Sequence, residues 1–204
     1  MRLYCLFPIT FALITSAAHA GIENAREAYE RKDYATALAE FHVLAKRNDT
    51  EALSILSIMY LNGEGVPRDV QKAIEYATKA VEKGDNGGLS LLAAMYLSPK
   101  AGLRDRAKGL QYLRTGVAKG ELNSLVRMAD LMLEGVQVPQ DFDSAFNYLE
   151  KAANRYDSVP AAQGLGQMYE YGLGRPIDEA KALKWYRSVP KTSTRPVLAE
   201  IAGV

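Results

Sequence analysis

The sequence predicts an all-α fold, an α/α solenoid of about five antiparallel helix hairpins followed by a short C-terminal cap. Three observations lead to this prediction. Similar residues recur at a spacing of 36 positions. Apolar residues within each repeat follow the period of an α-helix, and the links between helices carry glycine, proline and aspartate in a constant order. A fixed period of this length indicates a repeat architecture in which each unit completes the core of its neighbour.

Residues 1–20 have the three-part layout of a secretory signal peptide. Met1-Arg2 supplies a positive charge, residues 3–14 an apolar stretch, and Ala18-His19-Ala20 a small-residue cleavage site. The alternative is a membrane anchor, but an anchor needs about 20 apolar residues and this run is shorter. We therefore expect cleavage after Ala20, a bacterial protein that is periplasmic or secreted, and no stable membrane insertion of the mature chain.

The repeat units are expected to form a solenoid over residues 21–190. A first hairpin with a shorter link is predicted over about 22–48, and four fuller units over about 51–84, 87–120, 123–156 and 160–190. In these four units an aromatic residue or a methionine ends the first helix, an aspartate begins the second, and a small residue and then an aromatic residue follow. The recurring positions are Tyr60, Tyr96, Met132 and Tyr169; Asp69, Asp105, Asp141 and Asp178; Ala73, Gly109, Ala145 and Ala182; and Tyr76, Tyr112, Tyr148 and Trp185.

The links between paired helices are expected to end one helix and begin the next. Gly63 can adopt the left-handed conformation that closes a helix, and Pro67 prevents the helix from resuming. Asp69 can then cap the following helix by accepting hydrogen bonds from the free amides of its first turn. The same order recurs over residues 135–141 and 172–178, whereas residues 99–105 keep the aspartate but lose most of the pattern.

Residues 191–204 follow the last unit and are expected to form either a short cap or a frayed end. Pro196 fits the first turn of a helix, in which Val197, Leu198 and Ile201 would share one side. Such a helix would close the last hairpin, because the terminal units of solenoids need a closing element. A free chain end is the alternative.

Residues 52–84 resemble the Sel1-like repeat, a relative of the tetratricopeptide repeat, in the order Ala52-x3-Leu56-x2-Met59-Tyr60-x2-Gly63-x-Gly65-Val66-x2-Asp69-x3-Ala73-x2-Tyr76-x3-Ala80-x3-Gly84. Four units match from residue 51 to about 190, and residues 25–48 are similar to a tetratricopeptide-type hairpin. The resemblance implies a helical scaffold that holds other proteins together. Some secreted relatives, with cysteines paired across each hairpin, are said to bind penicillin-like molecules, but the mature part of this chain has no cysteine.

The residue inventory argues against an enzyme, a metal site and a cofactor. After removal of residues 1–20, His42 is the single histidine and no cysteine remains, which excludes thiol nucleophiles and clustered Cys or His ligands. Losing Arg2 turns 25 basic residues into 24, equal to the 24 acidic residues. A balanced chain has no electrostatic preference for nucleic acid. We therefore expect no catalytic residue, no metal, no cofactor and no nucleic-acid partner.

Two recurring residue types are expected to serve packing. The aromatic column of Tyr76, Tyr112, Tyr148 and Trp185 would fill the gaps between adjacent hairpins. The alternative for this column is a stacking platform for sugars or bases. The methionines Met59, Met95, Met132 and Met168 are expected to fill the core.

The candidate binding surface lies on the first helix of each hairpin, which lines the inner curve of tetratricopeptide-type solenoids. By that resemblance, the residues outside the packing pattern are free to contact a partner. Ile58 and Leu61 would receive an apolar anchor, unless the preceding hairpin covers them, and the acidic residues would attract a basic flank. The full set is Ser54, Ile58, Leu61, Asn62, Ser90, Ala94, Leu97, Ser98, Val126, Asp130, Leu133, Glu134, Gln163, Gln167, Glu170 and Tyr171.

The sequence thus favours a periplasmic or secreted repeat scaffold that mediates protein–protein interaction through the concave face of the solenoid. Its partner would be an envelope protein or a peptide segment. The alternative function is that of a cell-wall or polysaccharide-related ligand-binding protein, or a hydrolase, similar to the penicillin-binding relatives.

Overall fold

The computed structural model describes residues 21–103 and 105–188. Within these ranges the chain consists of helices joined by turns and contains no strand, which confirms the all-α prediction. None of the helices there is long and apolar enough to span a bilayer. The predicted signal peptide and the expected C-terminal cap lie outside the described residues.

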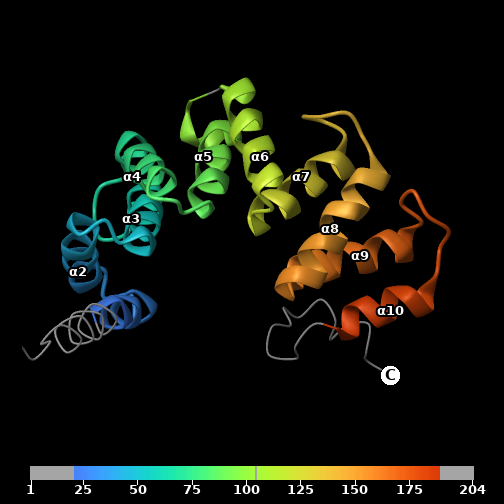
Figure 1. Ribbon diagram of the computed structural model, residues 1–204, viewed down its shortest axis with the longest axis horizontal. Coiled ribbons are helices and arrows are strands. Elements are labelled where there is room, and N and C mark those ends of the chain that lie inside the picture. The colour runs from blue at the N-terminus through green and yellow to red at the C-terminus, as the bar shows by residue number, and fades with distance from the viewer. Residues whose placement is uncertain (1–20, 104, 189–204) are drawn as a thin grey trace, which may run out of the picture. The chain divides into compact units, whose positions relative to one another are not determined.

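Within each half of the described chain, most helices pack against the next helix in sequence (Figure 1). Residues 21–30 form the first described helical segment. The helices that follow are α2 (Tyr34–Lys46), α3 (Thr50–Asn62), α4 (Val70–Glu82), α5 (Gly87–Leu97), the 3-10 turn η1 (Pro99–Ala101), α6 (Arg106–Lys119), α7 (Leu122–Glu134), α8 (Phe142–Tyr156), α9 (Val159–Tyr171) and α10 (Glu179–Arg187). The first helices of the four fuller repeats are therefore α3, α5, α7 and α9.

The links have the chemistry that the sequence predicts. Gly63 ends α3 in the left-handed region, with φ of 77°, and its amide donates to the carbonyl of Met59. The Asp69 carboxylate accepts from the amide of Lys72 at 3.0 Å and so caps α4. The three other predicted aspartate caps, Asp105, Asp141 and Asp178, each accept from the amide three residues further on, at 2.9 to 3.0 Å.

The chain divides into two compact units, residues 1–112 and 113–204, and the boundary falls within α6. The core of the first unit includes Phe41, Leu53, Leu56 and Met59, all fully buried. The core of the second unit is built around Leu125, Leu149, Leu165 and Met168, which are also fully buried. Each unit therefore has its own apolar core, formed between the helices of its hairpins.

The recurring small and aromatic positions contribute to both cores. The small residues Ala73, Gly109, Ala145 and Ala182 are buried. The aromatic column is half-buried, and Tyr76, Tyr112, Tyr148 and Trp185 pack against the two cores, as the packing prediction expects. Among the four methionines one expectation needs correction. Met132 is only partly buried, because Leu131 occupies the fully buried position that Met59, Met95 and Met168 fill in the other repeats.

Candidate functional site

A hollow of about 390 Å³ lies between the first helices α3 and α5 of the first unit. Four of its seven lining residues were predicted from sequence to contact a partner: Leu61 and Asn62 at the end of α3, and Ala94 and Ser98 at the end of α5. The Leu61 side chain packs against the core of the first unit, which holds it in place. Its carbonyl also accepts a hydrogen bond from Nε of Arg68, which lines the same hollow. This hollow therefore has a defined, partly apolar floor.

A second hollow, of about 400 Å³, lies in the second unit between α7 and the beginning of α9. Val126 and Asp130 of α7 are the two predicted residues that line it, and Val159 and Pro160 form the opposite wall. Burial raises the pKa of the Asp130 carboxyl, and Glu134 acts in the same direction, whereas the nearby Arg127 lowers it. The hollow thus combines apolar walls with one half-buried acid and one basic side chain, that of Arg127.

The structure corrects the prediction for Leu97. This side chain is only 9% exposed and belongs to the buried set of α5. It packs against α6 at Gly109, where an added Cβ would lie 2.7 Å from Cγ of Leu97. Because glycine leaves that space empty, Leu97 turns into the hairpin and is not available to a partner.

Three other predicted residues are engaged within their own unit. The Ser54 hydroxyl donates to the Asp85 carboxylate at 2.6 Å, and the Ser90 hydroxyl donates to the carbonyl of Gly87 at 2.8 Å. The Glu170 carboxylate accepts from the Tyr186 hydroxyl at 2.5 Å. Glu170 therefore connects α9 to α10, which makes it less available to a basic partner than the sequence suggests.

The remaining predicted residues line neither hollow. Of these, Glu134, Gln167 and Tyr171 are exposed, the last with 63% of its surface accessible. Ile58, Leu133 and Gln163 are partly exposed. The preceding hairpin thus leaves part of Ile58 accessible to solvent.

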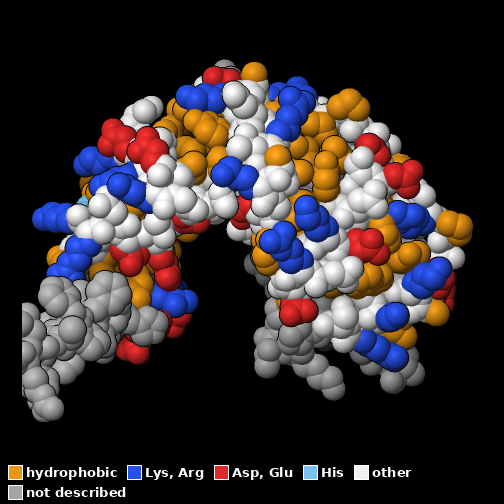
Figure 2. Space-filling view, viewed as in Figure 1, with side chains coloured by type: hydrophobic (Ala, Val, Ile, Leu, Met, Phe, Trp, Pro, Cys, Tyr) orange, Lys and Arg blue, Asp and Glu red, His pale blue; other side chains and the backbone are white. Residues whose placement is uncertain are grey.

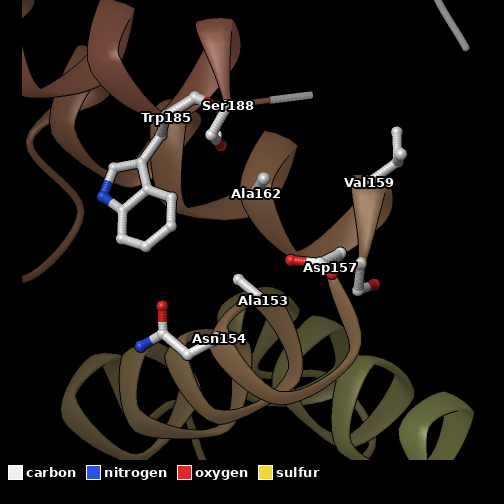
Figure 3. A pocket seen from close by; sticks show the side chains of 8 residues that line it. Ala153, Asn154, Asp157, Val159, Ala162, Trp185 and Ser188 are labelled. Carbon is white, nitrogen blue, oxygen red and sulfur yellow. Dashed lines mark hydrogen bonds between the residues drawn. The ribbon is translucent and has the colours of Figure 1, made fainter. Parts of the chain in front are cut away.

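The structure also shows a pocket that sequence reasoning did not anticipate, at the last hairpin (Figure 3). It has a volume of about 190 Å³ and is formed by the end of α8, the beginning of α9 and the end of α10. Trp185 projects into it from α10, and Asn154 and Asp157 reach it from the end of α8. A tryptophan in a column otherwise made of tyrosines was the only signal for this pocket in the sequence.

His42 belongs to an aromatic cluster in the first unit. Its Nε2 lies 3.4 Å from the Tyr60 hydroxyl and its Nδ1 lies 3.2 Å from the Tyr76 hydroxyl. The rings of Tyr60 and Tyr76 stack with centroids 5.5 Å apart, and Nζ of Lys72 lies 5.1 Å from the centroid of Tyr60. Burial lowers the pKa of His42, and the positive charges of Lys46 and Lys72 act in the same direction.

The described residues show a mixed surface without a metal-binding cluster. Over residues 21–103 and 105–188, no group of three or more histidine, cysteine or acidic side chains gathers to hold an ion. On the face shown in Figure 2, basic and acidic side chains are interspersed, with apolar patches between them. The binding opportunities on this part of the chain therefore lie in hollows between helices.

Helix hairpins that repeat along the chain define the class of α/α repeat proteins. The Sel1 repeat family model matches four times, over residues 50–85, 88–121, 123–157 and 159–188. The chain therefore belongs to the Sel1 repeat family. A search of the curated proteins found no significant match.

Several solved structures share the fold. A protective antigen of uropathogenic Escherichia coli strains, which displays an SLR fold, is 28% identical over 91% of this chain and 40% of its own, with a TM-score of 0.64. A Sel1 repeat protein from Oxalobacter formigenes is 26% identical over 82% of this chain and 48% of its own, with a TM-score of 0.66. The chain thus spans less than half the length of either.

An immunity protein from Pseudomonas aeruginosa has a TM-score of 0.67 at 21% identity, covering 92% of this chain and 67% of its own. At that level of identity the likeness concerns the fold alone. All three similar structures come from bacteria.

Proposed function

We propose that this protein is a periplasmic or secreted scaffold that binds another protein through the first-helix face of its hairpins, the concave face of the solenoid. Sel1 repeat proteins are in general scaffolds for protein–protein interaction, and this chain carries four such repeats. The proposed export depends on the signal-like residues 1–20, and the bacterial origin of the similar structures agrees with it.

The observation that carries the proposal is the position of the two hollows. Each lies between consecutive first helices, and the two together collect Leu61, Asn62, Ala94, Ser98, Val126 and Asp130, none of which the repeat pattern requires. Interfaces between proteins combine an apolar centre with a polar rim. Both hollows have that composition, because apolar side chains such as Leu61 and Val126 lie beside amide, hydroxyl or carboxylate groups.

The proposed partner inserts apolar side chains into these hollows and places a basic group beside Asp130. A half-buried carboxylate interacts more strongly with a cation than a fully solvated one, because less water screens it. Glu134, an exposed neighbour on the same helix, adds negative charge at that end. An envelope protein or one of its extended segments fits this description.

The experiment is capture of partners from an envelope extract by the mature protein and by four variants. Ala94→Arg fills the first hollow and Asp130→Lys reverses the charge of the second. Ala118→Arg on the exposed side of α6 and Glu150→Lys on the exposed side of α8 are matched controls, because they make the same changes outside the hollows.

We expect Ala94→Arg or Asp130→Lys to lose a protein that the wild type and both controls retain. The variants at the exposed positions 94, 118 and 150 should melt within about 2 °C of the wild type, as exposed substitutions do. Asp130 is half-buried, so capture by Asp130→Lys is compared after its melting curve shows that the variant is folded. Equal capture by all four variants would move the binding surface away from the two hollows.

A further inference from the structure

The pocket at the last hairpin has an aromatic wall on an otherwise small-residue floor. Trp185 reaches into it from α10 and is partly buried against the second core, which fixes the ring in place. Ala153 and Ala162 line the open space beside the ring from different helices, as Figure 3 shows. The backbone at Trp185 is also held, because its carbonyl accepts a hydrogen bond from the Ser188 hydroxyl at 2.7 Å.

Polar groups without a protein partner surround this ring. The Asn154 amide points into the same space as the indole ring, and the Asp157 carboxylate lies across the pocket (Figure 3). Among the described residues, no hydrogen bond or ion pair engages the side chain of Asn154, of Asp157 or of Trp185. An amide both donates and accepts, a carboxylate accepts and an indole N–H donates. The pocket therefore offers both kinds of hydrogen-bonding group around one aromatic face.

A second hollow, of about 410 Å³, adjoins this pocket and shares Asn154, Trp185 and Ser188 with it. It adds the side chains of Tyr169, Lys181 and Lys184. Lys181 is engaged by Asp178 at 3.1 Å and lies over the Tyr169 ring, so its position is set by the protein. The two spaces border on the same Trp185 side chain, and together we call them the Trp185 path, which extends from Asp157 to Lys184.

We propose that this path is a binding site for a short saccharide, with one sugar ring against the indole of Trp185. A sugar ring has apolar C–H faces and an edge of hydroxyls that both donate and accept. An anion alone would be repelled by Asp157, and a cation alone by Lys181 and Lys184. Asn154 and Asp157 are exposed and have no protein partner to give up, so they are available to the hydroxyls of such a ring.

The combination of an indole, a free amide and a free carboxylate is found only at the last repeat, within the described residues. The repeat before it has Tyr148 in place of Trp185 and Ala118 in place of Asn154, so it lacks both the indole and the amide. In the repeat earlier still, Asp85 takes the place of Asp157, and its carboxylate is engaged by Ser54 and by the amide of Gly87. The free groups around Trp185 are thus a property of one site and not of the repeat pattern.

This site shares Ser158 and Val159 with the second hollow of the proposed protein-binding surface. It shares none of the residues that the variants of either test change, so the two proposals can fail separately. Its test uses the fluorescence of Trp185, which is the single tryptophan of the chain. The full mature protein is titrated with chitotriose, maltotriose and trigalacturonate. Adenosine serves as a comparison ligand, because its base also stacks on aromatic rings.

We expect at least one of the three saccharides to produce a saturable change in Trp185 emission and a matching heat of binding by calorimetry. Asn154→Ala should raise the Kd by about tenfold, as loss of one well-placed hydrogen bond does. Asn147→Ala is the matched control, since Asn147 is an exposed asparagine two turns earlier on the same helix α8 and should bind as the wild type does.

Three results would each overturn the proposal. The first is the absence of a saturable signal with every saccharide, and the second is tight binding of adenosine alone. The third is found in the protein without ligand: Trp185 is protected from acrylamide quenching as fully as a buried tryptophan. A part of the chain would then already fill the pocket.

Discussion

His42 shows how a single residue acquires a role that its sequence context does not reveal. Both of its ring nitrogens lie within hydrogen-bonding distance of tyrosine hydroxyls that belong to α3 and α4. The sequence indicates a helical histidine, but the contacts come from residues 18 and 34 positions further along the chain. Only the packed hairpins bring these three side chains together.

The stability of the protein should depend on pH through His42. Burial, assisted by Lys46 and Lys72, lowers the pKa of His42 in the folded state below its ordinary value of about 6.5. The unfolded chain therefore binds the proton more readily, so this contribution to stability is complete above about pH 6.5 and is lost as the pH falls towards the folded pKa. Melting temperatures measured from pH 7.5 to 5 should fall more steeply for the wild type than for His42→Gln. Parallel curves would contradict this expectation.

Two other residues also differ from their sequence predictions because they make contacts with neighbouring helices. Leu97 and Glu170 looked free in the sequence because the repeat pattern does not require them, yet Gly109 and Tyr186 on neighbouring helices engage them. Asp69 and its three counterparts were predicted correctly as helix caps, because a cap depends on residues within one turn. Local interactions could therefore be predicted from sequence, whereas those between helices could not.

At the scale of the elements, the second helix of the second repeat has an unusual contact with α5. Alanine occupies the buried small position in the three other repeats, and glycine occupies it at residue 109. A helical Gly→Ala substitution ordinarily stabilises by about 1 kcal/mol. At Gly109, however, the added methyl would lie 2.7 Å from Cγ of Leu97 and 3.1 Å from Cβ of Tyr96.

We therefore expect Gly109→Ala to destabilise the protein by about 1–3 kcal/mol, in the range of overpacked cores. The alanine that stands at this position in the other three repeats would instead suggest that the substitution stabilises the protein. The measurement is denaturant unfolding of Gly109→Ala, Leu97→Ala and the double variant. Because Leu97→Ala removes the obstructing atoms, the double variant should be more stable than the sum of the single effects predicts. Strict additivity would show that the two residues do not compete for the same space.

The links also differ from repeat to repeat in one hydrogen bond. The residue before the capping aspartate returns to the end of the preceding first helix, where Nε of Arg68 donates to the carbonyl of Leu61 at 2.9 Å. Gln140 does the same with the carbonyl of Leu133 at 3.0 Å. The third such link has Ile177 at this position, an apolar side chain that is 67% exposed and has no donor.

Restoring the donor at this position should strengthen the last hairpin. We expect Ile177→Arg to raise the free energy of unfolding by about 0.5–1 kcal/mol, the net value of one hydrogen bond. Ile177→Ala is the control, because it removes the exposed apolar side chain without adding a donor. The free energy of unfolding of both variants is measured by urea unfolding. If both gain the same amount, the effect comes from removal of the exposed isoleucine and not from the new hydrogen bond.

At the scale of the whole molecule, the fold was predictable and the hollows were not. The 36-residue period and the link chemistry specify which residues form helices and which faces those helices bury. The hollows arise where the side chains of two neighbouring repeats fail to fill the space between them, and a repeat pattern describes only what the repeats share. The pocket at Trp185 is the clearest case, since it depends on substitutions that occur in one repeat.

Export of the protein gives a prediction about the complete chain. If Ala18-His19-Ala20 is processed as expected, the N-terminus of the protein recovered from the periplasm or medium will begin with Gly21, followed by Ile22, Glu23 and Asn24. Edman sequencing or intact mass measurement of that fraction checks this. Changing Ala18 and Ala20 to bulky residues should leave a larger precursor, whereas recovery of intact Met1 in a soluble cytoplasmic pool would rule out processing.

The pairing of Leu97 with Gly109 limits how this array can be rebuilt by duplication. Arrays of this kind lengthen when a segment of one period is copied, and the copy can begin at any residue. A copy that keeps α5 together with α6 transmits the large and the small residue as a set. A copy whose boundary falls between α5 and α6 would place Leu97 against the second helix of another repeat, which carries alanine at the position of Gly109. The alanine methyl and the Leu97 side chain would then compete for the same space. The most favourable boundaries for duplication or for engineered exchange therefore lie between hairpins and not within the link from residue 98 to 105.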